Sequence, residues 1–238
     1  MMQLAFSLLD WFALSKERTC RKDWMDFARG GQKPPAEPSV FSKRLPMMLS
    51  RRMSPASRYA VECALELLES HRVDAIVNAS RYAETARGEK SLIALANDQE
   101  PSPTDFTMSV HNVAPGMLTI FRKLNIPVTS VAAGANTFEA ALFEVSAFLK
   151  DGKESVLLVD YENLLPEILG SRLAPVKEPF AVAMILQEGN ALTAVAQNLS
   201  DTEPSETDVL QFLKGVLRPE ASFSVRSGCR QWAWRKAL

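Results

Sequence analysis

The sequence predicts an α/β protein with a mixed, mostly parallel, five-stranded sheet, helices on both faces and an antiparallel edge. Apolar stripes at helical spacing alternate along the chain with short, nearly continuous apolar segments, which are typical of strands covered on both faces. The resulting order of elements, β-α-β-α-α-β-α-β-β, favours the same architecture. With 238 residues the chain can bury one sizeable core, so we interpret 1–238 as a single domain.

Caps, turns and periodicity place the individual elements. Residues 2–14 predict the first strand, and 15–52 predict an irregular surface excursion because prolines cluster between 34 and 38. The next helix begins at Ser54 as N-cap with Pro55 in its first position. The later elements are a helix to 71, a strand at 73–79, a helix at 84–97, an extended segment at 106–111, a helix at 113–123, a strand at 127–131, a helix at 135–150, a strand at 155–160, a hairpin of 180–187 and 192–198 around 188–190, and a helix at 207–217. The tail 199–238 is assigned poorly by these patterns.

Composition narrows the class of protein. The net charge of −1 and the 47% content of hydrophobic residues are typical of a soluble domain and give no sign of nucleic-acid binding. The three cysteines are widely spaced and only two histidines are present, so we expect neither a disulfide framework nor a metal site. The apolar start at 1–14 is too short to span a bilayer, and we expect a cytoplasmic protein without a membrane partner.

The segment 125–137 is the most informative part of the chain. It reads as a buried strand that enters a tight turn and then a helix. In many α/β enzymes such an elbow exposes a nucleophile beside the backbone N–H groups of a helix N-terminus. Here the exposed positions are Val131, Ala132 and Ala133, none of which can attack an acyl group. The sequence therefore predicts the frame of an acyl-transfer site without its reactive group.

Three segments in order resemble the N-terminal half of a β-ketoacyl synthase. The segment 51–58 (RRMSPASR) resembles that family's basic approach to its first helix, and 112–120 (NVAPGMLTI) resembles its N-x-A-x-G-x-x-S-I segment. The segment 128–134 stands where the family has its S-T-A-C-A elbow, with Ala132 in the place of the catalytic cysteine. The likeness covers roughly 50–190 and implies a thiolase-like half-fold. The run 106–112 and the short chain look most like the chain length factors of aryl polyene gene clusters.

The resemblance implies a non-catalytic subunit. The family's two catalytic histidines lie in a C-terminal half that this chain does not contain, and His71 and His111 align with neither. Condensation needs a thiolate to carry the acyl chain and imidazoles to stabilise developing charge. The resemblance therefore implies pairing with a complete, active β-ketoacyl-ACP synthase, whose acyl or polyene tunnel this chain would shape in polyketide or fatty-acid-like biosynthesis. An acyl carrier protein would be met through that complex, and no cofactor is expected.

The resemblance also assigns residues to the partner interface and acyl pocket. Met108 would suit the end wall of the tunnel because methionine fills irregular apolar gaps. The alternative is that these are ordinary core residues. The set consists of Phe106, Thr107, Met108, Ser109, Val110, His111, Asn112, Gly116, Met117, Val128, Ser130, Val131, Ala132 and Ala133.

Basic residues and tryptophans supply further candidates. Arg51, Arg52 and Arg58 would contact an acidic carrier protein or its phosphate, or else form a solvated basic face. Trp232 and Trp234 in the tail predict either an exposed docking segment or an edge strand folded back on the core.

Two other functions stay open. The first is an acyltransferase or thioesterase that uses Ser130 with His111. The second is a structural homodimer, formed through the strand at 127–131, that binds no acyl ligand.

Overall fold

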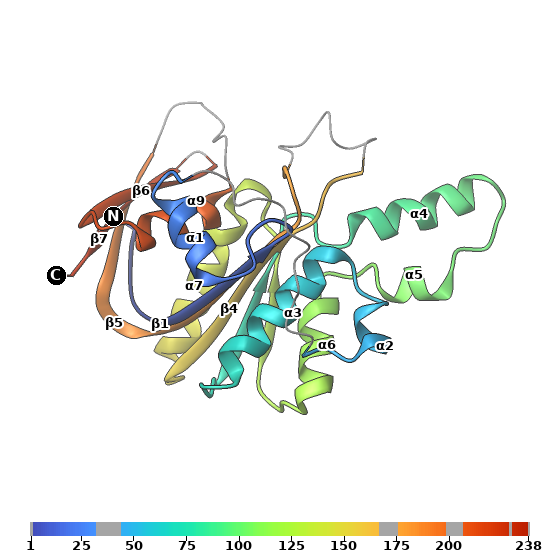
Figure 1. The fold of residues 1–238 in the computed structure, drawn as a ribbon, viewed down its shortest axis with the longest axis horizontal. Coiled ribbons are helices and arrows are strands. Elements are labelled where there is room, and N and C mark those ends of the chain that lie inside the picture. The colour runs from blue at the N-terminus through green and yellow to red at the C-terminus, as the bar shows by residue number, and fades with distance from the viewer. Residues whose placement is uncertain (1, 32–43, 167–175, 199–206, 229, 238) are drawn as a thin grey trace.

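The computed structural model describes residues 2–31, 44–166, 176–198, 207–228 and 230–237, and it contains one seven-stranded sheet (Figure 1). The strands are β1 (Gln3–Ser15), β2 (Ala75–Ala79), β3 (Val128–Val131), β4 (Ser155–Glu162), β5 (Phe180–Asn198), β6 (Ser222–Ser227) and β7 (Arg230–Lys236). The helices are α1 (Arg21–Ala28), α2 (Met47–Ser50), α3 (Pro55–Leu68), α4 (Thr85–Ala96), α5 (Pro103–Thr107), α6 (Val113–Arg122), the short 3₁₀ helix η1 (Gly134–Asn136), α7 (Thr137–Lys150) and α9 (Asp208–Leu217).

The sheet is mixed, as expected, but it is not mostly parallel. The strands β3, β2 and β4 pair in parallel, whereas β4 with β5, β5 with β1, β5 with β7 and β7 with β6 pair antiparallel. Alongside the first half of β5 the order is β3-β2-β4-β5-β1. The whole sheet has seven strands instead of the five predicted. The strands β7 and β6 extend the sheet from the second half of β5. The parallel prediction was wrong because the connections after β4 and β5 return the chain in the opposite direction.

The predicted hairpin at 180–198 is a single long strand, β5. It remains one strand because β1 runs antiparallel along both of its halves: Ser7 pairs with Gln187 and Phe6 pairs with Leu192. The residues between are bulged out of the ladder. Glycine is needed there, since a Cβ at Gly189 would lie 2.0 Å from the Ser7 Oγ.

Helices cover both faces of the sheet, as the sequence predicted. Alternate residues of the central strands point to opposite faces. On one face, Leu158 and its neighbours pack with α7 and α9. On the other, Leu157 and its neighbours pack with α3 and α6. The helix α3 begins as predicted, with the Ser54 hydroxyl accepting the Ser57 N–H.

Three helices, α1, α2 and α5, lie where the sequence predicted irregular or extended chain. Within the excursion at 15–52, α1 begins at a capping box formed by Cys20 and Asp23 and buries Trp24. The helix α5 replaces the beginning of the extended segment at 106–111. Its N-cap is Ser102, whose hydroxyl accepts the Asp105 N–H at 3.3 Å. A serine followed by proline marks both α3 and α5, and only the first was interpreted as a helix start.

The C-terminal tail is regular. Trp232 and Trp234 lie on β7 with 2% and 1% of their surface exposed. The folded-back strand is therefore the correct alternative, although β6 rather than β7 forms the edge. The acidic loop expected at 199–207 lies, apart from Thr207, outside the described residues.

Candidate functional site

The elbow predicted at 125–137 is present at the carboxyl edge of the parallel strands. Its strand is not buried as predicted, since Val128 and Ser130 are exposed and Thr129 and Val131 are half-buried. The strand β3 ends at Val131, and η1 then leads directly into α7. The Thr137 hydroxyl accepts the Ala133 N–H at 2.9 Å and donates to the Gly134 carbonyl at 2.8 Å, which closes the turn. Gly134 has φ +57°, a conformation that favours glycine. The helix itself starts two residues later than predicted because this 3₁₀ turn precedes it.

The exposed positions of the elbow carry no nucleophile. Ala132 and Ala133 are exposed and Val131 is half-buried, and a methyl or isopropyl group cannot form an acyl intermediate. Ser130 on β3 and His111 are both exposed. Among the described contacts, none joins the Ser130 hydroxyl to the His111 ring. The described structure therefore does not pair Ser130 with His111.

The run 106–112 lies at the same edge of the sheet. Asn78 at the end of β2 donates to the His111 carbonyl at 3.3 Å, and β2 pairs with β3. Phe106 is 70% exposed and Val110 is 49% exposed. Met108, in contrast, is only 8% exposed and belongs to the core under α3 and α6. The side chain expected to form a tunnel wall thus packs inward, and its two apolar neighbours face outward.

The other predicted interface residues surround the elbow and this run. Val128 on β3 is 38% exposed, and Gly116 and Met117 on α6 are half-buried. Thr107 and Asn112 are exposed and Ser109 is half-buried. Of the predicted basic residues, Arg51 and Arg52 are exposed and Arg58 is half-buried.

Three buried carboxyl groups lie at the same end of the sheet, and the sequence reading did not single them out. Glu162 accepts hydrogen bonds from the Arg81 and Tyr82 N–H groups. Burial, opposed by Arg81, raises its pKa to about 7. Burial also raises the pKa of Asp208 to about 6 and that of Asp160 well above its ordinary range. For Asp160 and Glu162 the sequence contains a signal, since both follow the apolar run 156–159 on β4. Asp208 lies on α9.

Residues at the β6–β7 connection contact the turn of the elbow. The Ser227 hydroxyl lies 3.3 Å from the Ala135 carbonyl and 3.0 Å from the Asp208 carboxylate. The neighbouring Gly228 has φ +54°, and a Cβ there would lie 2.2 Å from the Asn136 Oδ1. The turn before α7 is therefore fixed by the β6–β7 connection as well as by its own hydrogen bonds.

Among the described residues, no group of three or more His, Cys, Asp and Glu side chains is arranged to hold a metal ion. No described helix has the length and apolar character needed to cross a membrane.

Comparisons with known proteins agree with this geometry. The chain matches a solved structure of the ketosynthase ApeO in complex with its chain length factor ApeC from Xenorhabdus doucetiae, with 38% identity and a TM-score of 0.89 over 98% of this chain and 100% of that chain. The ishigamide ketosynthase/chain length factor matches at 14% identity, with a TM-score of 0.66 over 90% of this chain and 72% of that chain. AntDE:AntF, a type II polyketide synthase acyl-carrier protein in complex with its ketosynthase, matches at 12% identity, with a TM-score of 0.62 over 84% and 70% of the two chains. The last two similarities concern the fold alone. A comparison with curated protein sequences gives no match.

The family profile described as "Beta-ketoacyl synthase, N-terminal domain" matches residues 24–235. This span contains the elbow, the run 106–112 and both layers of helices. The strand–turn–helix geometry and the profile match thus lead to one conclusion: this chain belongs to the β-ketoacyl synthase family, whose N-terminal domain it carries.

Proposed function

We propose that this protein is a non-catalytic chain length factor. It pairs with a complete, active β-ketoacyl-ACP synthase and shapes the tunnel that receives the growing acyl or polyene chain. The observation that carries the proposal is the intact elbow with Ala132 at its exposed position. The frame that a condensing enzyme uses to present its thiolate is retained, and the group that would bind the acyl chain is absent.

The extent of the match to the ApeO–ApeC structure supports a partner role. The match to the ApeO–ApeC structure includes 98% of the present chain and 100% of the chain that it resembles. That chain is therefore about as short as this one. The ishigamide and AntDE:AntF chains are covered only to 72% and 70% of their lengths. The present chain thus corresponds in size to that chain of the ApeO–ApeC complex.

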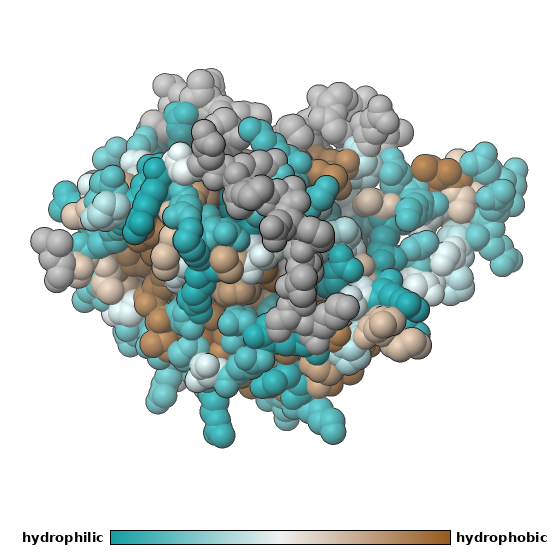
Figure 2. Space-filling model, viewed as in Figure 1, coloured by the Kyte–Doolittle hydropathy of each residue, from teal (hydrophilic) through white to brown (hydrophobic). Residues whose placement is uncertain are grey.

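The distribution of exposed apolar side chains favours a partner on one side of the molecule. Most of the large exposed hydrophobic residues are on α2, α4, α6, β3 and the run 106–112, and Figure 2 shows hydrophobic surface on the projecting α4 region. Those on this side are Met47, Met48, Leu92, Ile93, Leu95, Phe106, Val110, Ile120 and Val128. In addition, β3 ends the strand order, so among the described strands its outer edge is unpaired. Such edges are templates for pairing with another chain.

Phe106 and Val110 are the side chains that we assign to the tunnel of the partner. Both are apolar, exposed and attached to the same short run. A growing chain stops where further extension would overpack a rigid wall, at about 1–3 kcal/mol for each misfit. Such a wall can be supplied by side chains that perform no chemistry. Met108 has a different role in this proposal, because it anchors the run to the core.

Contact with an acyl carrier protein is assigned to Arg51 and Arg52. Both guanidinium groups are exposed near the start of α3, and guanidinium binds phosphate and carboxylate groups with two parallel hydrogen bonds. Arg58 is half-buried and contributes less to this surface.

The test is co-expression with the complete ketosynthase of the same gene cluster, followed by size-exclusion chromatography with light scattering. A 1:1 complex that condenses malonyl units is expected. Incubation with an acyl thioester and mass spectrometry should place the acyl group on the ketosynthase subunit, and Ser130→Ala should change nothing. Acylation of Ser130 would establish the acyltransferase alternative, and a homodimer that ignores the ketosynthase would establish the structural one.

A further inference from the structure

The helices α4 and α5 form an arm that projects from the body of the molecule (Figure 1). We define the arm as residues 85–107. No residue of α4 or α5 is buried, so the arm is not oriented by apolar packing of these two helices. The run with Phe106 and Val110 begins at its end. Met108 anchors the middle of the run to the core, but the arm on its N-terminal side needs a constraint other than a hydrophobic core.

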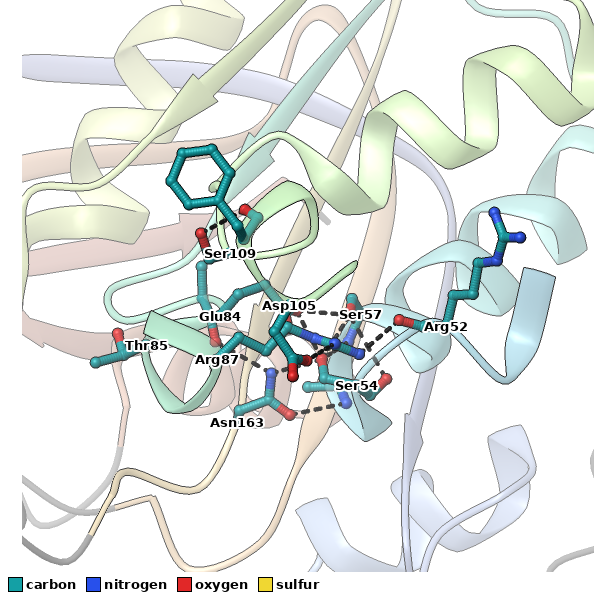
Figure 3. A network of polar contacts seen from close by, with 12 residues as sticks. Arg52, Ser54, Ser57, Glu84, Thr85, Arg87, Asp105, Ser109 and Asn163 are labelled. Carbon is teal, nitrogen blue, oxygen red and sulfur yellow. Dashed lines mark hydrogen bonds and ion pairs between the residues drawn. The ribbon is translucent and has the colours of Figure 1, made fainter. Parts of the chain in front are cut away.

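The Arg87 side chain joins three parts of the chain at the base of the arm (Figure 3). Its Nη1 donates to the Asp105 Oδ1 at 2.7 Å, and its Nη2 donates to the Arg52 carbonyl at 2.5 Å. Its Nε lies 3.3 Å from the Glu84 Oε2. One planar guanidinium thus links α4, α5 and the chain before α3, using donors whose relative directions are fixed.

Glu84 anchors this guanidinium in the body of the protein. Its side chain is 1% exposed, and its Oε1 accepts hydrogen bonds from the Ser54 and Ser57 hydroxyls, each at 2.6 Å. Asn163, just after β4, donates to the Ser54 Oγ at 2.9 Å and to the Ala83 carbonyl at 3.1 Å. The base of the arm is therefore tied to α3 and to the sheet.

The backbone at this point is itself constrained. Ala83 has φ +38°, a conformation that costs a non-glycine residue free energy unless its surroundings enforce it. The Ala83 N–H donates to the Ser80 Oγ at 2.7 Å, opposite the Asn163 contact with its carbonyl. These contacts fix the direction in which the arm leaves the sheet. Arg87 then fixes α5 relative to α4 through its contact with Asp105.

We propose that Arg87, through Asp105, is a positioning residue for chain-length selection: it holds Phe106 and Val110 in the place where they meet the acyl chain in the partner. This inference rests on the proposed function. It also links two surfaces, because the same guanidinium binds the carbonyl of Arg52, which we assign to the carrier-protein contact.

Asp105→Asn tests the proposal with the least risk to folding. Asp105 is 27% exposed, whereas removal of Arg87 would leave the buried Glu84 without its cation. Asp105→Glu keeps the carboxylate and serves as the conservative rescue. Glu100→Gln is the matched control, since it removes an exposed carboxylate from the same arm and the described residues give it no side-chain partner.

Two measurements are made on each variant. In the isolated chain, hydrogen exchange of the amides of 103–110 should be about tenfold faster in Asp105→Asn than in the wild type, because a charge-assisted contact is lost. In the complex with the ketosynthase, the product distribution should broaden to more than one length, while the dissociation constant changes less than about threefold. Asp105→Glu and Glu100→Gln should behave as the wild type in both measurements.

Unchanged exchange in Asp105→Asn would overturn the role of Arg87 in fixing the arm. Faster exchange with an unchanged product distribution would overturn its role in chain-length selection. If the wild-type chain forms no complex with the ketosynthase, the proposed function itself fails, and the selection role fails with it. In that case the exchange result still reports separately whether Arg87 fixes the arm.

Discussion

At the scale of single residues, the buried carboxyl groups behind the elbow couple stability to pH. Burial raises the pKa of Asp208 from 3.8 to about 6 and that of Glu162 from 4.5 to about 7. Between roughly pH 4 and 7 the folded state therefore holds more protons than the unfolded state. The stabilisation is present in full below the unfolded pKa values and is lost as pH rises through the folded ones.

Asp208→Asn removes one of these titrations. A shift of about two pKa units corresponds to about 3 kcal/mol, so the fall in stability between pH 4 and 7 should be smaller by an amount of that order. The melting temperature of the isolated chain, measured from pH 4 to 8, checks this. The exposed Asp98→Asn is the control. An unchanged slope in Asp208→Asn would show that this carboxyl group is not buried as described.

Val110→Trp and Met108→Trp separate the outward side of the run from the inward side. Val110 is 49% exposed, so Trp there should leave the melting temperature unchanged and shorten the product of the ketosynthase complex. Met108 is 8% exposed in the core, and the larger side chain should destabilise the isolated chain by about 1–3 kcal/mol. Chemical denaturation and product analysis by mass spectrometry distinguish the two effects. A shortened product from a stably folded Met108→Trp variant would reverse the assignment.

At the scale of elements, close contact between α9 and β6 depends on one glycine. A Cβ at Gly215 would lie 2.0 Å from the Phe223 ring, which stacks on Trp234 at an interplanar angle of 6°. A larger residue at position 215 would therefore prevent α9 from packing this closely on β6.

Gly215→Ala should destabilise the isolated chain by about 1–3 kcal/mol, because overpacking outweighs the better helix propensity of alanine. Gly116→Ala is a matched control on another helix, since nothing lies within 4 Å of the added Cβ. It should be more stable by about 0.5–1 kcal/mol. Urea denaturation of the two variants measures both values, and equal effects would contradict the close contact at Gly215.

Local signals in the sequence were sufficient for the elements that have clear caps and periodicity. The helix after Ser54 and the elbow at 125–137 were predicted because each depends on residues near in sequence. The continuity of β5 was not predictable locally, since it depends on β1 pairing along both halves. The burial of Met108 and the contacts of the Arg87 guanidinium were also not predicted, because their partners come from distant segments.

At the scale of the whole molecule, exposed apolar residues and the free edge of β3 gather on one side. A partner that binds the folded chain there raises its apparent stability in proportion to the logarithm of its concentration. This protein should therefore melt at a higher temperature in the presence of the ketosynthase than alone.

Val128→Lys should abolish that increase. Lysine on an edge strand opposes pairing with another chain. Because Val128 is partly exposed and contributes little to the isolated fold, the free energy of unfolding of the chain alone should change by less than about 0.5 kcal/mol. Thermal scans with and without the ketosynthase check this, with the exposed Gln197→Lys on β5 as control. An undiminished increase in Val128→Lys would place the interface elsewhere.

The pairing of β1 with β5 has a consequence for how the protein is made. Among the described strands, β1 pairs with β5 alone, and its partner residues lie between Phe180 and Val195. During synthesis at about 5–20 residues per second, the N-terminal strand must wait roughly 10–35 seconds before its partner leaves the ribosome. Throughout that time Leu4, Phe6 and Trp11, which are buried in the finished fold, remain without their final cover, and exposed apolar surface of this kind favours aggregation of the nascent chain.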